Sequence, residues 1–481
     1  SAPASRVGSF TAEAFQAHLA GLPSGLPSWW LERKRAAYER FASLPLPVRT
    51  DEAWRFSNLA GLTLEGCAPV PAPKTALTAS IGVRKSAKLV FANGSLVSRE
   101  LIDTDLARRG VVLDSLRNAL VQHGDLVREH LLAQPSRLGS AKFAALHEAF
   151  LADGAFIHVP KGVEVELPVG IFSYALGDGT AVFPHTLVVA GDNARISVVE
   201  YFGSGSDEET QFAVGANDLY AGHGAQVTYA GKQDWSHRAL SLQLNSTVVR
   251  RDARVQSLNL HLGGRQVRHE SLSQLQAPGA FSEMLSLSVA HGEQEFDLRT
   301  LQVHQAPDTK SDLLYKNALL DRARTIFSGL IVVDPDKAWQ RFKGVRDWDE
   351  GRGRLLASLA AWRERRAMSR NRPRGWILDD AVLREVVQSV PRDRAALAVG
   401  GRVGERALRH EVAVGVEPQV ETASGQRDVE TRPPPEDARH RLESATVDVP
   451  LSHNVRVVGK CFGCRSLRRA GNHHAHVLAD L

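Results

Sequence analysis

The sequence predicts a mainly β protein whose central part, residues 155–336, is a right-handed parallel β-helix. Two observations lead to this prediction. Short strands with period-2 alternation follow one another without a helix of normal length between them, which excludes a doubly wound βαβ fold. The strands also share a corner phrase that recurs at intervals near 28 residues, as expected for stacked rungs. Residues 1–154 form a mostly helical N-terminal region, and residues 337–481 form an atypical tail, partly helical or disordered.

The N-terminal region begins with an amphipathic helix after Pro27, for which Ser28 is the predicted N-cap. Three apolar residues share one face of this helix: Trp30, Ala37 and Phe41. Two further segments are amphipathic at helical spacing, namely residues 115–133 and 142–152. Between these helices, residues 88–94 predict a strand that enters an Asn-Gly hairpin turn.

The central part contains nine predicted strands. They are residues 156–159, 163–167, 186–189, 196–199, 226–229, 240–244, 255–262, 285–289 and 326–333. The corner phrase is a Gly or Asp turn followed by alanine, at Ala194, Ala225, Ala253, Ala280 and Ala323. These alanines are 31, 28, 27 and 43 residues apart, so the last gap contains either one more corner or an insertion. Small alanines allow close stacking, and we expect the β-branched residues after them to fill the interior. A β-sandwich gives similar strand spacing but does not need a repeated corner phrase.

The composition limits the function classes. The net charge of +5 is uneven, because residues 337–481 hold 27 Lys and Arg against 19 Asp and Glu, whereas residues 1–336 are mildly acidic. Nucleic-acid binding is therefore suggested only by the tail, and we expect none in the body. No run of 18 apolar residues and no apolar leader is present, so neither a membrane span nor secretion is expected. Three cysteines do not form a disulfide framework, and a reducing cytoplasm is predicted.

Several phrases resemble the SufB/SufD family of the SUF iron–sulfur pathway. The most specific is residues 304–317, HQAPDTKSDLLYKN, and its continuation is residues 323–333. Other matching phrases are residues 49–56, 89–94, 143–147 and 156–163. The Trp-Arg-Phe phrase at residues 54–56 is closer to the SufD members than to the SufB members. The resemblance covers about residues 1–336.

The resemblance implies a non-catalytic scaffold of iron–sulfur cluster assembly. SufD-like proteins pair with SufB through their β-helices, and each holds a SufC ATPase through helices beyond the β-helix. No cofactor is expected to be bound permanently, and an iron–sulfur cluster would form transiently on the assembled complex. The chain has no GxxxxGK[ST] phosphate loop, so ATP hydrolysis by this chain is not expected. The alternative is a β-helical carbohydrate-active enzyme, which would need clustered Asp and Glu residues on one face.

The resemblance stops near residue 336. The family's Cys-x-His-Gly phrase and SufC-binding segment are not visible, which makes SufC contact doubtful. Residues 337–481 instead contain 24 Arg, no Tyr and a single Ile, Ile377. Such a composition is what a GC-rich gene gives when it is read out of frame, so we predict a frameshift near codon 337; the alternative is a genuine lineage-specific tail. Helical-looking stretches occur at residues 375–399.

Candidate site residues come from the best family match and from the tail. His304, Thr309, Ser311 and Lys316 are family-motif positions in the β-helix, and the Lys316 cation could hold sulfide or persulfide sulfur. Its alternative role is a stem packed on the coil with its head in water. In the tail, Cys461, Cys464 and His473 have the composition of a zinc site, or they are a chance result of the frameshift.

The remaining cysteine and histidines are expected to be structural. Cys67 is predicted to be a loop or packing residue rather than a cluster ligand. Histidines scattered along the strands show no ligand spacing in the sequence, although imidazole could bind ferrous iron; they are His185, His223, His237, His261 and His291.

Overall fold

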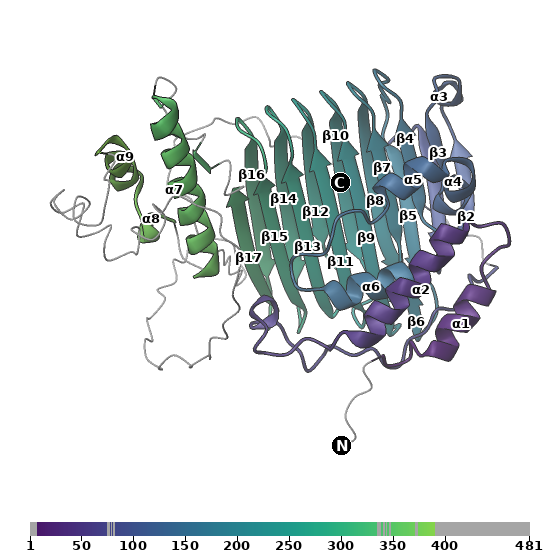
Figure 1. Cartoon of the computed structure of the whole chain (residues 1–481). Coiled ribbons are helices and arrows are strands. Elements are labelled where there is room, and N and C mark those ends of the chain that lie inside the picture. Colours follow the sequence, from purple (N-terminus) through teal and green to yellow (C-terminus); the bar gives the residue numbers. More distant parts are fainter. Residues whose placement is uncertain are drawn as a thin grey trace, which may run out of the picture. The chain divides into compact units, whose positions relative to one another are not determined.

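The computed structural model describes residues 7–389 apart from 75–76, 78, 80–81, 334–337, 340–341, 343, 346–347 and 371–373. These residues divide into two compact units on either side of the Val332–Val333 bond. The first unit contains the N-terminal helices and all the strands, and the second contains three helices. Figure 1 shows the elements of each unit with the labels used below.

The first unit is a β-solenoid made of two sheets whose strands alternate along the chain, which confirms the predicted parallel β-helix (Figure 1). Sheet A has nine strands in the order β17-β15-β13-β11-β9-β7-β4-β3, with β6 paired to β9. Its strands are β3 Val112–Ser115, β4 Ala155–Val159, β6 Thr180–Val182, β7 His185–Ala190, β9 Gln211–Ala221, β11 Leu240–Val249, β13 Gln266–Leu275, β15 Glu295–His304 and β17 Arg324–Val333.

Sheet B has eight strands in the order β16-β14-β12-β10-β8-β5-β1-β2. Its strands are β1 Ala87–Ala92, β2 Ser95–Leu101, β5 Val169–Ala175, β8 Arg195–Ser204, β10 Gln226–Asp234, β12 Arg254–His261, β14 Phe281–Ala290 and β16 Lys310–Leu319. Five long strands were missed in the sequence, namely β5, β9, β13, β15 and β16. One predicted strand, residues 163–167, is wrong, because only an isolated bridge at Glu164 forms there.

The corner phrase forms a ladder along the solenoid. The carbonyl of each corner alanine accepts a hydrogen bond from the residue that follows the corner one rung later, for example Gln226 N–H to Ala194 O at 2.8 Å. Lys310 N–H donates to Ala280 O at 3.0 Å, so Thr309 occupies the next corner in place of an alanine. This is the extra corner within the 43-residue gap, and Ala323 belongs to the opposite edge, where Arg324 N–H donates to Gln294 O.

The corners need a left-handed backbone conformation just before the small residue. Asn193, Gly224, Asp252, Gly279 and Asp308 occupy this position, with φ between 55° and 76°. Asn and Asp tolerate this region better than other side chains, and glycine adopts it freely. This explains why Gly, Asp or Asn occupies the position before the small residue.

The N-terminal end of the solenoid is closed by antiparallel strands. β1 pairs with β5 in parallel on one side and with β2 in antiparallel on the other. Asn93 and Gly94 make the turn between β1 and β2 with positive φ angles, as predicted. β3 pairs with β4 in antiparallel and closes sheet A in the same way. The N-terminal region therefore contributes strands as well as helices.

Six helices precede or follow these first strands: α1 Ala12–Ala20, α2 Ser28–Ser43, α3 Asp105–Arg108, α4 Leu116–Gln122, α5 Gly124–His130 and α6 Ala141–Phe150. A 3₁₀ turn, η1, spans Glu52–Trp54. The N-cap prediction was wrong, because Ser28 is already helical and Pro27 is the cap residue. The predicted helix at residues 115–133 is broken into α4 and α5 at His123, whose backbone leaves the helical region.

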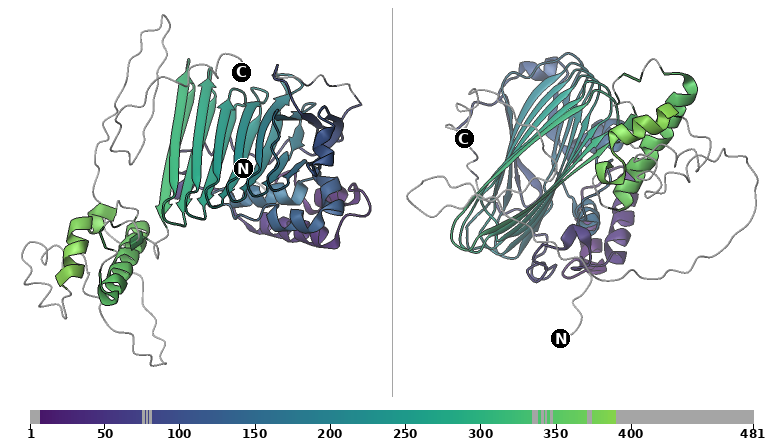
Figure 2. Two further views of the ribbon diagram at one scale, coloured as in Figure 1. Left: turned by 90° about the horizontal axis from the view of Figure 1, so that it is seen from above. Right: turned by 90° about the vertical axis from the view of Figure 1, so that its left-hand side faces the viewer.

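The helices cover the outer face of sheet A (Figure 2). Aromatic residues of α1, α2 and α6 pack on strands β9 and β11 in one cluster, which includes Phe15, Phe41, Phe150, Phe212 and Leu242. As a result, the middle of sheet A is buried on both faces, and every residue of β9 and β13 is buried, whereas β17 at the end of the sheet is largely exposed. Sheet B instead alternates between buried and partly exposed residues, which is the pattern of a sheet with one solvated face.

The second unit contains α7 Glu350–Ser369, α8 Arg374–Ile377 and α9 Asp380–Ser389. Its core gathers leucine, valine and phenylalanine side chains of these helices and of the segment before them: Phe342, Leu356, Leu359, Leu383 and Val387. The Arg363 guanidinium is fully buried and donates to Leu378 O at 2.9 Å and to Asp380 Oδ1 at 2.7 Å. The helices at 374–377 and 380–389 confirm the helical stretch predicted there, as far as residue 389.

Candidate functional site at the open end of the solenoid

The C-terminal end of the solenoid is formed by strands β16 and β17. Within the described residues β16 pairs only with β14, and β17 pairs only with β15. Large apolar side chains on these two strands are exposed, with exposed fractions of 51% for Leu314, 53% for Leu330 and 61% for Ile331. In contrast to the antiparallel cap at the other end, this end presents unpaired parallel strands with apolar side chains.

Three of the four predicted site residues meet at the corner between β15 and β16. His304 Nδ1 lies 2.8 Å from Thr309 Oγ1, and its Nε2 lies 2.9 Å from Ser311 Oγ. Because the Thr309 hydroxyl donates to Ala306 O, it accepts from His304 Nδ1–H. The Ser311 hydroxyl lies within hydrogen-bond distance of both His304 Nε2 and Gln302 Oε1. Burial lowers the pKa of His304, which keeps this ring neutral. The cluster is a closed hydrogen-bonded corner.

Lys316 does not join this cluster. Its side chain is exposed on the outer face of β16, where its register partner is Leu287 of β14. This position fits a lysine whose ammonium group is in water. A role of Lys316 in holding sulfur stays a prediction.

Replacement of His304 by alanine is expected to loosen this corner selectively. The change removes two hydrogen bonds from a partly buried corner, which costs about 1–2 kcal/mol. Hydrogen exchange followed by mass spectrometry is expected to show faster exchange in β16, with unchanged exchange in β8 and β9. Equal protection of β16 in both proteins would show that the cluster does not hold the corner.

The interior of the solenoid contains a buried carboxyl group. Glu200 of β8 accepts hydrogen bonds from Thr186 Oγ1 at 2.8 Å, Asn217 Nδ2 at 2.9 Å and the Tyr229 hydroxyl at 2.8 Å. Burial raises the pKa of Glu200 to about 7, and these three hydrogen bonds offset part of that effect. Glu200 can therefore gain or lose a proton near neutral pH inside the coil.

Polar side chains continue from this group toward the open end. Gln243 donates to Asn217 Oδ1 at 3.2 Å and to Asn245 Oδ1 at 2.8 Å. Asn245 Nδ2 lies 3.1 Å from His269 Nε2, and His269 Nδ1 lies 3.1 Å from His261 Nε2. Burial lowers the pKa of both histidines, to about 4 for His261, so both rings are neutral. The chain of contacts joins four rungs.

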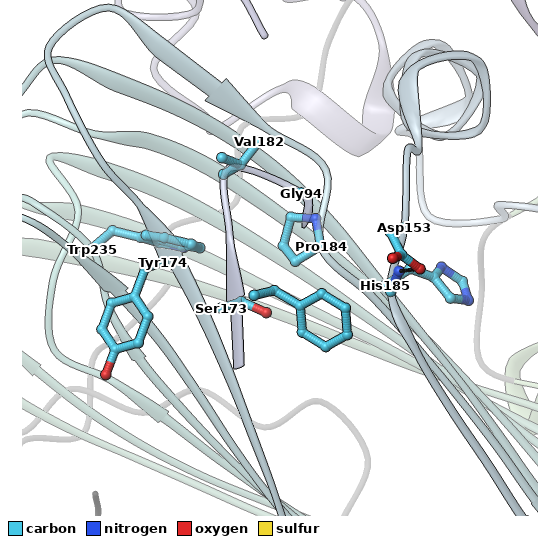
Figure 3. A pocket seen from close by; sticks show the side chains of 10 residues that line it. Gly94, Asp153, Ser173, Tyr174, Val182, Pro184, His185 and Trp235 are labelled. Carbon is cyan, nitrogen blue, oxygen red and sulfur yellow. Dashed lines mark hydrogen bonds between the residues drawn. The ribbon is translucent and has the colours of Figure 1, made fainter. Parts of the chain in front are cut away.

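A second pair of buried histidines lies near the covered face of sheet A. His147 of α6 places Nδ1 2.7 Å from Val214 O, and its Nε2 lies 3.1 Å from His185 Nδ1. A carbonyl can only accept, so His147 donates through Nδ1. Burial lowers the pKa of His147 to about 3. His185 also lines a cavity of about 10 Å³ with Asp153, Ser173, Pro184 and Trp235 (Figure 3), a volume close to that of one water molecule.

The sequence did not reveal these pairs, because the partners lie on different strands, on a helix or in different corners and share no ligand spacing. His261 and His269 are brought together by the corner between β12 and β13, and the rings of His237 and His291 lie 4.9 Å apart between their centres. No group of three or more His, Cys, Asp or Glu residues in the described part of the chain could hold a metal ion. The His147–His185 and His261–His269 pairs are hydrogen-bonded inside the fold.

The described cysteine is a packing residue. Cys67 is buried in the cluster beneath α1 and α2, and burial together with the Asp178 carboxylate raises the pKa of its thiol. A thiolate is disfavoured there, which agrees with the packing role predicted for it. The zinc-site candidates Cys461, Cys464 and His473 lie outside the described residues.

The fold defines a class: a parallel β-solenoid whose last two strands are each paired on one side only within the described residues. Two family models match consecutive parts of it. Residues 13–171 match the SufBD protein N-terminal region, and residues 173–339 match the SufBD core domain of SUF system FeS cluster assembly. Through residues 13–339, which are more than half of its length, this chain belongs to the SufB/SufD family.

Individual relatives show the same extent of similarity. The iron–sulfur cluster assembly protein SufD of Bacillus subtilis is 26% identical over 63% of this chain and 71% of its own length. SufB of the same bacterium is 23% identical over 63% of this chain and 68% of its own length. A SufBD family protein of Synechocystis is 24% identical over 63% and 69% of the two chains. No helix in the described part of the chain is long and apolar enough to cross a membrane.

The tail gave an unexpected match. Residues 352–413 match the HRDC domain model, and the described part of this range contains α7, α8 and α9 around one apolar core. A sequence read out of frame is not expected to match a family model or to bury leucines on one side of its helices. The frameshift prediction therefore does not fit residues 352–413. For residues 414–481 it stays a prediction.

Proposed function

We propose that this protein is a non-catalytic scaffold of iron–sulfur cluster assembly that pairs with a SufB-like partner through the open end of its solenoid, in the cytoplasm. Membership of the SufB/SufD family supports the pathway. The observation that carries the pairing is the pair of terminal strands β16 and β17, each hydrogen-bonded on one side only within the described residues and each with exposed leucine side chains.

Unpaired strands at this end favour the addition of a partner's strand. Backbone N–H and C=O groups along β16 and β17 can form hydrogen bonds with another strand without a change in backbone conformation. An uncovered strand edge is otherwise a site of aggregation. Burial of Leu314, Leu330 and Ile331 in such a contact adds apolar area at about 25 cal/mol per Å². The terminal strands β2 and β3 at the other end are also paired on one side only within the described residues, but Val97 is the one exposed large apolar side chain that they carry, which makes the open end the better binding surface.

The iron–sulfur cluster is cargo in this proposal. It would form transiently on the assembled complex, and the SufC ATPase would supply the energy. The family's SufC-binding segment is not visible in this sequence, so we expect this chain to join the complex without holding SufC itself.

Replacement of Leu330 by lysine is expected to weaken binding to a SufB-like partner about 10-fold to 100-fold, since the change places a charge in the buried contact. The measurement is the dissociation constant in a biolayer assay with a purified SufB-family protein. Val97 is 43% exposed on β2, at the capped end, and Val97→Lys is the matched control. Equal loss of binding in both variants, or in neither, would contradict the proposal.

A further inference from the structure

Two exposed histidines meet at one edge of the solenoid. His237 belongs to the corner between β10 and β11, and His291 belongs to the corner between β14 and β15. One further corner, between β12 and β13, separates them, so their backbones are about 10 Å apart at the usual spacing of neighbouring strands. The centres of the two rings nevertheless lie only 4.9 Å apart, with the ring planes at 80°. The side chains therefore reach toward each other across the corner between them.

The middle of this intervening corner consists of two glycines, Gly263 and Gly264, which are both buried. Gly264 has a φ of 86°, in the left-handed region that favours glycine. A Cβ atom at Gly263 would lie 2.0 Å from the backbone oxygen of Trp235, which excludes any side chain there. The fold therefore requires glycine at both positions, and the missing side chains leave room for the two imidazole rings to approach each other.

Hydrogen bonds fix both histidine backbones to the glycine corner. His291 N–H donates to Gln294 Oε1 at 2.9 Å, and Gln294 Nε2 donates to Gly264 O at 2.9 Å. On the other side, Gly264 N–H donates to the backbone oxygen of Trp235 at 2.9 Å, two residues before His237. The Gln294 side chain that makes these contacts is buried. The distance between the two histidine backbones is thus set by the stacking of the corners.

The two imidazole rings have no other role among the described residues, where neither ring hydrogen-bonds to another side chain or to the backbone. The charged side chains beside them in the chain are engaged with each other's neighbours. Arg238 pairs with Glu208 at 2.9 Å, and Glu293 pairs with Arg322. The ring nitrogens of the histidine pair are therefore available to a ligand from solution.

The separation of the rings matches the one that a shared metal ion requires. A bond from zinc to an imidazole nitrogen is about 2.0–2.1 Å long, which places the centre of a bound ring about 3.2 Å from the ion. Two rings at the tetrahedral angle on one ion have centres about 5.2 Å apart, close to the 4.9 Å between His237 and His291. Imidazole binds divalent ions such as Ni²⁺, Cu²⁺ and Zn²⁺, whereas Mg²⁺ and Ca²⁺ prefer oxygen ligands.

We propose that His237 and His291 form a two-histidine site for a divalent transition-metal ion at the edge of the solenoid, with water as the remaining ligands. The described part of the chain contains no third His, Cys, Asp or Glu residue placed to complete the site. The bound ion therefore keeps exchangeable positions, in contrast to a structural zinc site with four protein ligands. This site is independent of the proposed pairing at the open end.

The test is isothermal titration calorimetry of the full chain with Zn²⁺. His237→Ala and His291→Ala are each expected to weaken binding at this site about 100-fold, because the second ligand of a fixed pair binds at a high effective concentration. The double variant H237A/H291A is expected to bind no more weakly than either single variant, since the two rings hold one ion. His223→Ala, at an exposed corner histidine on the opposite edge, is the matched control and is expected to bind like the wild type.

Unfolding in urea gives a second readout. An ion held between two corners stabilises only the folded solenoid, so Zn²⁺ is expected to raise the urea midpoint of the wild type and of His223→Ala but not of His237→Ala. Equal Zn²⁺ affinity in the wild type and His237→Ala, or equal losses in His237→Ala and His223→Ala, would overturn the proposal and leave a ring contact without a ligand. Leu330→Lys is expected to bind Zn²⁺ like the wild type, which separates this site from the pairing at the open end. Circular dichroism confirms the fold of each variant.

Discussion

Replacement of Arg268 by alanine is expected to lower the free energy of unfolding by about 3–5 kcal/mol. The Arg268 guanidinium lies between β13 and the N-terminal segment and donates to Glu270 at 2.8 Å and to Asp297 at 2.5 Å. The side chains of both carboxylates are no more than 6% exposed, so the alanine variant leaves the buried Glu270 without its cation and Asp297 with Arg299 alone. Acid groups in this state are among the most destabilising defects in a protein core.

Arg268 also connects distant parts of the chain. It donates to Ala53 O at 3.0 Å and to Leu138 O at 2.9 Å, and its guanidinium lies 3.7 Å from the centre of the Trp54 ring. We therefore expect Arg268→Ala to release the segment around η1 from sheet A, in addition to lowering global stability. Limited proteolysis is expected to cut the variant between α2 and β1 before the solenoid unfolds.

The measurement is urea unfolding followed by circular dichroism, with Arg195→Ala as the control. Arg195 forms an ion pair with Glu164 at 3.0 Å, and both side chains are about half exposed. Exposed pairs of this kind contribute about 0–1 kcal/mol. Arg268→Lys is expected to behave much like the alanine variant, because an ammonium group cannot make the two-sided contacts of the guanidinium fork. If Arg268→Ala lowers the free energy of unfolding by less than about 1 kcal/mol, Arg268 does not hold the N-terminal segment to sheet A.

The second large effect concerns Glu200 and pH. Its pKa is raised from the ordinary 4.5 to about 7 by burial, so the folded chain binds the proton more tightly than the unfolded chain. The stabilisation is fully present below about pH 4.5 and is lost as the pH rises toward about 7. Glutamine does not titrate. The difference in unfolding free energy, Glu200→Gln minus wild type, is therefore expected to grow by about 2–3 kcal/mol between about pH 5 and about pH 8.

A difference between two proteins isolates this effect from the buried histidines. Their lowered pKa values act in the opposite direction, because neutral buried histidines destabilise the fold when the pH falls through the ordinary range of imidazole. They cancel when the variant is compared with the wild type at each pH. Glu208→Gln, at an exposed ion pair with Arg238, is the control and is expected to give a flat difference. A flat difference for Glu200→Gln would mean that Glu200 titrates normally.

The sequence predicted the architecture because a solenoid is built from local signals. A corner turn needs a residue in the left-handed backbone conformation followed by a small residue, and the strands between corners alternate apolar and polar residues. Both features involve residues that are close to one another in the sequence. Strands β9, β13 and β15 escaped this reasoning because they are buried on both faces and show no clear alternation. The N-cap at Ser28 and the long helix at 115–133 failed because the position of a helix end depends on backbone geometry that periodicity does not reveal.

For the candidate site, the sequence predicted which residues are involved, and the structure showed which of them are hydrogen-bonded to one another. Of the four predicted residues, His304, Thr309 and Ser311 meet because they flank one corner, and Lys316 does not join them. The partners of Glu200 come from three other strands, and no spacing in the sequence connects them. The interior was expected to hold β-branched residues, and on β14 it holds serines instead.

The sequence by itself determined the solenoid, the position of its corners and the family phrase at residues 304–317, because each depends on residues that are neighbours in the chain. Only the tertiary structure decided which face of β14 is inside, which acids surround Arg268 and which donors surround Glu200. The physical reason is the register between rungs. A polar side chain inside a coil is tolerated only when a partner from another rung reaches it, and that partner is fixed by how the rungs stack.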